Sequence, residues 1–445
     1  MIAAHDPFGN AISVQRATSV AAVAGFVDGF LGYRPSILAV LAAAEHDDSL
    51  IVQACAAALQ LFSESPSGFP RARAHLARAA NAALPSTERE RLFASAIQAW
   101  ARGDLATALA HHATLAQQHP RDLASVKLGQ YHAFNLGDTP TLLRLALWAA
   151  PAADDIPWLH GLLAFGHEQT HGLDAAEAAA RRGLAMRPDE PWAQHALAHV
   201  MLTDGRLAEG AYLLHQMSGG WAGLTSFMRC HNWWHLALFH LELGDDAAAL
   251  KLYDQQVWGV DKTYSQDQVG AVSLLARLEL AGVAVGERWA ELAEYLAGRT
   301  ADQVQPFLDL QYLYGLARAG RPEADTLLAN IGGFAGQAPA ASRAAWQRVA
   351  VPAAHGLLAH ARGRWADAAD QLALALPGLA SIGGSHAQRD LFEQVYIDAL
   401  QRAGRLAAVQ NLLQPRANAV PQSQRVRRRL HEVYAALELP ALAHH

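Results

Sequence analysis

Apolar residues recur every three or four positions along most of the chain, which is the period of helices with one buried face. Glycines, most of them leading into an alanine-rich run, interrupt this pattern at nearly regular distances. They stand at Gly103, Gly137, Gly172, Gly205 and Gly244, so the intervals are 34, 35, 33 and 39 residues. The pattern predicts helical units that stack on one another, because no unit of this length buries its apolar face alone.

Single units match a helix–turn–helix repeat. The segments 103–120 and 172–188 each begin with a turn glycine, continue with small residues and close with a proline, and weaker copies begin at Gly363 and Gly404. A glycine in a left-handed cap ends the first helix, and proline stops the second. These segments resemble tetratricopeptide repeats (TPR). We therefore expect an all-α fold, and the resemblance implies a TPR-like right-handed α-solenoid of antiparallel helix pairs whose first helices line the concave side.

The regularity of the repeats predicts three segments. Residues 1–95 read as an N-terminal capping helical segment, 96–330 as the TPR-like repeat core, and 331–445 as C-terminal TPR-like helical repeats. The glycine-rich stretch Ser218–Gly223 predicts a longer loop, and the Gly- and Ala-rich stretch Ala329–Ser342 predicts a loop or linker before the C-terminal helices. No strand pattern is evident.

Composition excludes several classes of protein. The 445 residues are 52% hydrophobic and 17% charged, with a net charge of -6, which argues against disorder and against a general nucleic-acid or anionic-membrane binder. Two cysteines, Cys55 and Cys230, cannot form a disulfide framework. Because no secretory signal or membrane-length apolar run is present, we expect a cytoplasmic protein. Histidine is unusually frequent at 22 residues, of which His444 and His445 are either native or a tag remnant.

Two histidine pairs stand at helical spacing. His195 and His199 precede Gly205 by ten and six residues, and His231 and His235 precede Gly244 by thirteen and nine. Offsets of 13, 10, 9 and 6 fall on one helical stripe, so the pairs should share a face of two successive helices.

This arrangement suits a divalent metal. Imidazoles with one carboxylate, from Asp254 or Asp309, would suit zinc, iron(II) or manganese. A hydrolytic zinc helix would need a glutamate after the first histidine, but Ala196 and Asn232 stand there. The alternative is that these histidines are solely structural and bond to backbone or water.

A third cluster follows Gly383. Ser385 is a plausible N-cap, and His386, Arg389 and Asp390 then stand at i, i+3 and i+4 on the next helix. Arg389 either clamps an anionic group of a substrate or ties the C-terminal helices to the repeats.

Longer segments resemble the tetratricopeptide-repeat protein 38 family, from Trp192 to Phe392. The carrying motifs are His195–Val200, Cys230–Leu238, Ala248–Asp254, Ser273–Leu278, Gly282–Trp289 and Gly383–Asp390. The resemblance implies a soluble helical-repeat protein and singles out polar positions. These are His195, His199, His231, Asn232, Trp234, His235, Asp254, Asp309, Gln388, Arg389 and Asp390. His386 departs from the family, where asparagine also occurs.

The leading hypothesis is a pocket on the concave face that binds a small molecule with the help of a metal ion. The hypothesis includes the case in which this pocket is a catalytic site. We expect His195, His199, His231 and His235 to bind the metal, and His231, His235, Asp254 and Arg389 to carry any chemistry. The expected substrate-binding residues are Asn232, Trp234, Asp309, His386, Gln388 and Asp390. The alternative is a TPR interaction scaffold that binds a peptide or protein in its groove.

Overall fold

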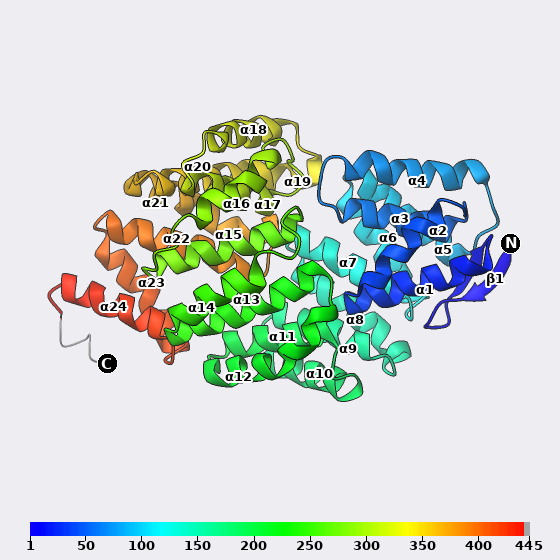
Figure 1. The fold of residues 1–445 in the computed structure, drawn as a ribbon, viewed down its shortest axis with the longest axis horizontal. Coiled ribbons are helices and arrows are strands. Elements are labelled where there is room, and N and C mark those ends of the chain that lie inside the picture. The colour runs from blue at the N-terminus through cyan, green and yellow to red at the C-terminus, as the bar shows by residue number, and fades with distance from the viewer. Residues whose placement is uncertain (440–445) are drawn as a thin grey trace. The chain divides into compact units, whose positions relative to one another are not determined.

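A computed structural model describes residues 1–439 of the chain (Figure 1). The chain divides into two compact units. Unit 1 comprises Met1–Leu197 and Ala222–Met228, and unit 2 comprises Ala198–Trp221 and the residues from Arg229 onward. Two of the three boundaries fall inside continuous helices, α11 (Pro191–Thr203) and α13 (Ser226–Leu243), and the third falls inside the 3-10 segment η2 (Ser218–Gly223). The expected segments 1–95, 96–330 and 331–445 remain predictions.

Unit 1 is a series of helices preceded by one hairpin. Its elements are β1 (Ile2–His5), β2 (Ala11–Val14), α1 (Ala17–Gly32), η1 (Pro35–Leu38), α2 (Ala39–Ala44), α3 (Leu50–Leu61), α4 (Gly68–Ala82), α5 (Glu88–Ala101), α6 (Leu105–Gln118), α7 (Leu123–Leu136), α8 (Thr139–Ala153), α9 (Pro157–Gln169) and α10 (Leu173–Met186). From α5 to α10 each helix packs on the next one along the chain. This pairing of consecutive helices is that of TPR-like repeats.

Aspartates begin several of these helices. The carboxylates of Asp104, Asp122 and Asp138 each accept a hydrogen bond from the backbone N–H three residues later, at 3.0–3.1 Å. Such an N-cap satisfies one of the four amides that the first helical turn leaves without a partner. The short turns between the repeats are therefore specified by local sequence.

The repeat glycines adopt the expected backbone, with one exception. Gly103 and Gly137 have φ values of 77° and 73°, in the left-handed region that suits glycine. Gly172 does not. There the preceding residue, His171, takes the left-handed conformation with a φ of 60°, and Gly172 sits at the start of α10 instead. The expectation of a left-handed cap at Gly172 is wrong by one position.

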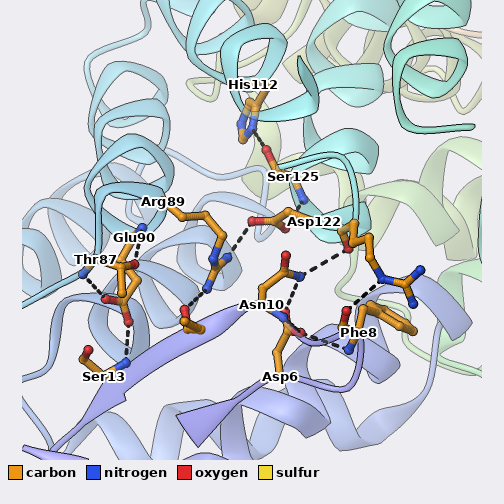
Figure 2. Close-up of polar contacts among 12 residues, drawn as sticks. Asp6, Phe8, Asn10, Ser13, Thr87, Arg89, Glu90, His112, Asp122 and Ser125 are labelled. Atoms are coloured by element: carbon orange, nitrogen blue, oxygen red, sulfur yellow. Dashed lines mark hydrogen bonds and ion pairs between the residues drawn. The ribbon is translucent and has the colours of Figure 1, made fainter. Parts of the chain in front are cut away.

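The sequence pattern missed the β1–β2 hairpin. Ile2 pairs with Val14 and His5 with Ala11 in antiparallel register. Asp6 closes the turn because its carboxylate accepts hydrogen bonds from the backbone of Phe8 and Asn10, both at 2.9 Å. Figure 2 shows how the hairpin is held by residues far along the chain.

Those contacts are polar and partly buried. The backbone N–H of Ser13 donates to Glu90 at 2.7 Å, and Asn10 donates to the carbonyl of Arg121 at 3.2 Å. Beside them lies the buried ion pair of Arg89 with Asp122, at 2.5 Å (Figure 2). Arg89 also donates to the Ala11 carbonyl, so one guanidinium joins the hairpin to the repeats.

Unit 2 continues the helical series. Its elements after α11 are α12 (Leu207–Met217), η2 (Ser218–Gly223), α13, α14 (Asp246–Leu252), η3 (Tyr253–Val257), α15 (Ser265–Leu280), α16 (Arg288–Leu296), η4 (Ala297–Arg299), α17 (Pro306–Arg318), α18 (Glu323–Gln337), α19 (Ala340–Ala345), η5 (Trp346–Ala350), α20 (Val351–Ala361), α21 (Trp365–Ala375), η6 (Leu376–Ile382), α22 (His386–Arg402), α23 (Leu406–Ala419) and α24 (Gln424–Ala436). Helices α20 to α22 pack consecutively, as do α22 to α24. The described chain is thus an all-α, TPR-like repeat protein with one small hairpin.

One expected linker is a helix. Most of the stretch Ala329–Ser342 lies in α18, because Leu327, Ile331 and Ala335 recur every four residues and are all buried. The glycines of this stretch have open space around their Cα atoms, so they sit on the outer face. The prediction of a linker weighed the glycines and overlooked this apolar stripe.

Candidate metal centre and adjoining pocket

Three histidines of unit 2 converge. His231 and His235 lie one turn apart on α13, and their Nε2 atoms are 3.2 Å apart. The ring of His199, on α11, lies with its centroid 4.5 Å from that of His235. One ring nitrogen of each of these three lies within 4.8 Å of the others. His195 precedes His199 by one turn of α11 and belongs to unit 1.

The spacing of the nitrogens fits one ion. Zinc–imidazole bonds of about 2.0–2.1 Å in a tetrahedron put neighbouring nitrogens about 3.3 Å apart. The 3.2 Å between the Nε2 atoms of His231 and His235 agrees with that edge.

The histidines are buried and suited to act as ligands. His199 is 1% exposed, His231 9% and His235 0%. Burial, with a smaller contribution from His199, lowers the pKa of His231 to about 3. Its imidazole is therefore neutral at pH 7 and has a lone pair to offer, which is the form that binds metals.

Trp234 fixes the orientation of two of these rings. Its indole stacks on His231 with centroids 5.2 Å apart and planes 10° apart, and it meets His235 edge-on at 4.9 Å. Such contacts restrict ring rotation, as outer-sphere partners of metal ligands do. Its neighbour Asn232 is fully buried, and neither side-chain amide atom has a hydrogen-bond partner within residues 1–439.

A pocket of about 260 Å³ opens beside His199. Its lining comes from α11, α12, α13, α15, α22, α23 and α24, all in unit 2. The lining residues are His199, Leu202, Thr203, Leu207, Leu238, Leu241, Glu242, Arg277, His386, Ala387, Asp390, Gln394, Arg416, Ala419, Val420, Ser423, Arg425 and Val426. His199 belongs to both features, so the pocket is next to the histidine cluster.

Two carboxylates in the pocket wall have arginine partners. Arg425 pairs with Glu242 at 2.6 Å, and Arg416 pairs with Asp390 at 2.7 Å. Although burial by itself raises the pKa of Asp390, nearby arginines, chiefly Arg416, hold it well below its usual range. Asp390 is therefore ionised at pH 7, and each acidic group is balanced by an adjacent guanidinium.

Asp254 lies elsewhere. It is exposed on the π-helical turn η3 and forms an ion pair with Arg288 through two hydrogen bonds of 2.7 Å. It is not part of the histidine cluster or the pocket lining. The expectation that its carboxylate completes the site is not supported by this position, because its two oxygens face a surface arginine.

Asp309 is buried on α17 and accepts a hydrogen bond from Gln303 at 3.3 Å. Burial, and then the charge of Asp302, raise its pKa well above the usual range. It also lies outside the cluster and the pocket lining. This environment favours the neutral carboxyl, whereas a metal ligand must be the carboxylate.

The cluster after Gly383 divides between two roles. Ser385 is the N-cap of α22, and Gln388 completes a capping box with it, as the N-cap expectation requires. Arg389 turns back to the carbonyl of Gly384 and lies 3.4 Å from His386. Of the three residues expected on one face, His386 and Asp390 line the pocket and Arg389 does not.

Sequence reasoning missed Arg277, the one pocket arginine outside the acidic pairs. The available signal was a charged residue in the apolar run Ser273–Leu278, where a buried helix would place it. Arg277 is 2% exposed and lies 5.4 Å from the centre of the Trp234 ring.

Comparisons with known proteins leave the family of this chain open. No protein-family model matches the chain. Human IFIT1 in a dimer with PPP-AAAA is 12% identical, with 89% of this chain and 88% of that chain covered and a TM-score of 0.42. Yeast Tom70 is 12% identical, with 80% and 90% covered and a TM-score of 0.26. The P58(IPK) TPR domain is 11% identical, with 80% and 90% covered and a TM-score of 0.21.

No helix in residues 1–439 combines the length and apolar character needed to cross a membrane.

Proposed function

We propose that this TPR-like protein binds a divalent metal ion at its clustered histidines and a small molecule in the pocket beside them. The observation that carries the proposal is the convergence of ring nitrogens from His199, His231 and His235, supported by the 3.2 Å spacing on α13. His195, one turn before His199 on α11, is the fourth ligand expected from the sequence. A buried group of imidazoles with this spacing exceeds what helix packing alone requires.

The type of donor atom narrows the choice of metal ion. Imidazole suits zinc and iron, whereas manganese favours oxygen ligands. Because Asp254 and Asp309 lie outside the cluster, the donors are all nitrogen, and zinc or iron(II) is favoured over manganese. A bound ion of this kind acts as a Lewis acid toward a ligand that reaches it. His199 lies between the cluster and the pocket, and Trp234 holds the rings of His231 and His235 in place.

The test is metal analysis of full-length protein purified without an affinity tag. The wild type should carry about one equivalent, and a His199→Ala/His235→Ala variant should carry almost none. A His112→Gln/His132→Gln variant is the matched control, since it also removes two buried histidines. His444 and His445 lie outside the described residues and are present in every sample. Equal, substoichiometric metal in all three proteins would overturn the proposal.

We also propose that the chain belongs to the tetratricopeptide-repeat protein 38 family. The motifs His195–Val200, Cys230–Leu238 and Gly383–Asp390 support this, and the first two carry the clustered histidines. The interaction scaffold remains the alternative function. It predicts a peptide or protein partner that is lost on groove mutation and is unaffected by metal removal.

A further inference from the structure

Arg277 stands apart from the other charged residues of the pocket. Glu242 and Asp390 are paired with Arg425 and Arg416 at 2.6 and 2.7 Å. Within residues 1–439 no ion pair joins Arg277 to a carboxylate, and its nearest polar partners are uncharged. Among the lining residues, three arginines therefore stand against two carboxylates, and Arg277 is the arginine without a direct ion pair. Arg416 also pairs with Glu393, which lies outside the lining.

The guanidinium is held but not neutralised. Arg277 donates to Ser273 on its own helix and to the carbonyl of Ala387 on α22 at 2.6 Å. Burial lowers its pKa to about 10, so it remains charged at pH 7. A guanidinium has five N–H donors, and these contacts do not use all of them. Arg277 also lines the pocket. Asp390 and Glu242 act on this charge only at longer range. A buried guanidinium without a directly paired carboxylate is costly, and an anionic ligand that contacts it would lower that cost.

The rest of the wall is mainly apolar. Leu202, Leu238, Leu241, Val420 and Val426 contribute aliphatic side chains from four segments of unit 2. Such a surface favours a ligand with a hydrocarbon body. One guanidinium without a direct ion pair suits a monoanion, whereas a doubly charged phosphate would bring a second charge that the apolar wall leaves without a partner.

We propose that Arg277 binds the carboxylate of a small organic acid whose apolar body lies against Leu238 and Val420. This names the class of small molecule for the proposed function and rests on the same pocket. It does not depend on the metal, because Arg277 supplies the anion contact by itself. The planar guanidinium matches a carboxylate through two parallel hydrogen bonds.

The test is calorimetric titration of full-length, EDTA-treated protein with three probes. Octanoate should bind, while 1-octanol and inorganic phosphate should bind at least tenfold more weakly. Arg277→Met should weaken octanoate binding at least tenfold, and Arg277→Lys should weaken it less. Arg318→Met, which removes an arginine paired with Glu279 outside the pocket, is the matched control and should bind like the wild type.

A second variant separates binding from folding. Val420→Trp keeps every charge and fills the pocket, so it should abolish octanoate binding even if Arg277→Met folds poorly. His231→Ala should lose metal in separate metal-loaded samples and keep octanoate binding, which distinguishes failure of the metal site from failure of the acid site. No octanoate binding by the wild type, tighter binding of phosphate, or unchanged binding by Val420→Trp would each overturn the proposal.

Discussion

Unit 1 and unit 2 each contain a group of buried histidines, and the two groups face different surroundings. In unit 1, His112 and His132 are fully buried with ring centroids 5.5 Å apart. His112 bonds to Ser125 at 2.8 Å (Figure 2), and His132 packs edge-on against Trp100. The rings in this pair meet aromatic and hydroxyl neighbours, as core histidines do.

The second group differs in geometry rather than in burial. Burial lowers the pKa of His132 to about 3, and it does the same to His231. A depressed pKa therefore marks a buried ring in both units and does not identify a site. What separates unit 2 is that ring nitrogens from two helices converge and that a pocket opens beside His199.

Zinc titration should show the largest difference between the groups. Zinc at one hundred times its Kd should raise the free energy of unfolding by about 2.7 kcal/mol, because it binds the folded state alone. Urea unfolding of EDTA-treated protein, with and without zinc, measures this. His132→Phe should keep the effect and His231→Ala should lose it. An equal effect in both variants would remove the distinction between the two groups.

Lowering the pH should reduce the stability of the folded protein through His132 of the unit 1 pair. Its pKa is about 3 when folded and near 6.5 when unfolded, so below pH 6.5 the unfolded chain takes up a proton that the folded chain does not. Stability is therefore full above pH 6.5 and falls by about 1.4 kcal/mol per pH unit below it. We expect His132→Phe to lose about 2 kcal/mol less than the wild type between pH 6.5 and 5 in urea unfolding. Parallel pH profiles would contradict this.

The indole of Trp234 gives a smaller effect, confined to unit 2. Trp234→Phe should weaken zinc binding about tenfold, since the stacked partner that fixes His231 is reduced in size. Competition with a chromophoric chelator measures the affinity. Trp289→Phe, at another buried tryptophan of unit 2, should leave it unchanged. If both variants bind zinc equally well, the ring contacts are packing alone.

Asp254 should give the smallest effect. Its ion pair with Arg288 is exposed, and such pairs contribute roughly 0–1 kcal/mol. We expect Asp254→Asn to leave zinc affinity unchanged in the same chelator assay and to alter stability only slightly. A tenfold loss of affinity would return Asp254 to the metal site.

The fold was predictable because its signals are local. Gly103 and Gly137 specify left-handed caps, and the repeats follow from their spacing. The β1–β2 hairpin was not predictable, because two four-residue strands give little sequence pattern and are held by distant partners such as Glu90 and Arg121. Local glycine content also misled at Ala329–Ser342, where the buried stripe of α18 decides the structure.

The site was predictable in part for a related reason. Histidine offsets from Gly205 and Gly244 place side chains on faces, and that information is contained in each repeat. The direction in which a long side chain points is not contained in the repeat pattern. Arg389 turns back to the Gly384 carbonyl, while Arg277 occupies the pocket, and the π-helical turn at Asp254 shifts the register that a regular helix would give.

The hairpin has a consequence for biosynthesis. Helical repeats close mostly through contacts between neighbours, so they assemble as the chain leaves the ribosome. Phe8 and Asn10, however, bond to Arg121, more than one hundred residues later. The first strands to be synthesised must therefore wait for α5 and the α6–α7 turn, and during that wait their edges are open to other nascent chains. The hairpin is therefore completed only after the α6–α7 turn has been synthesised.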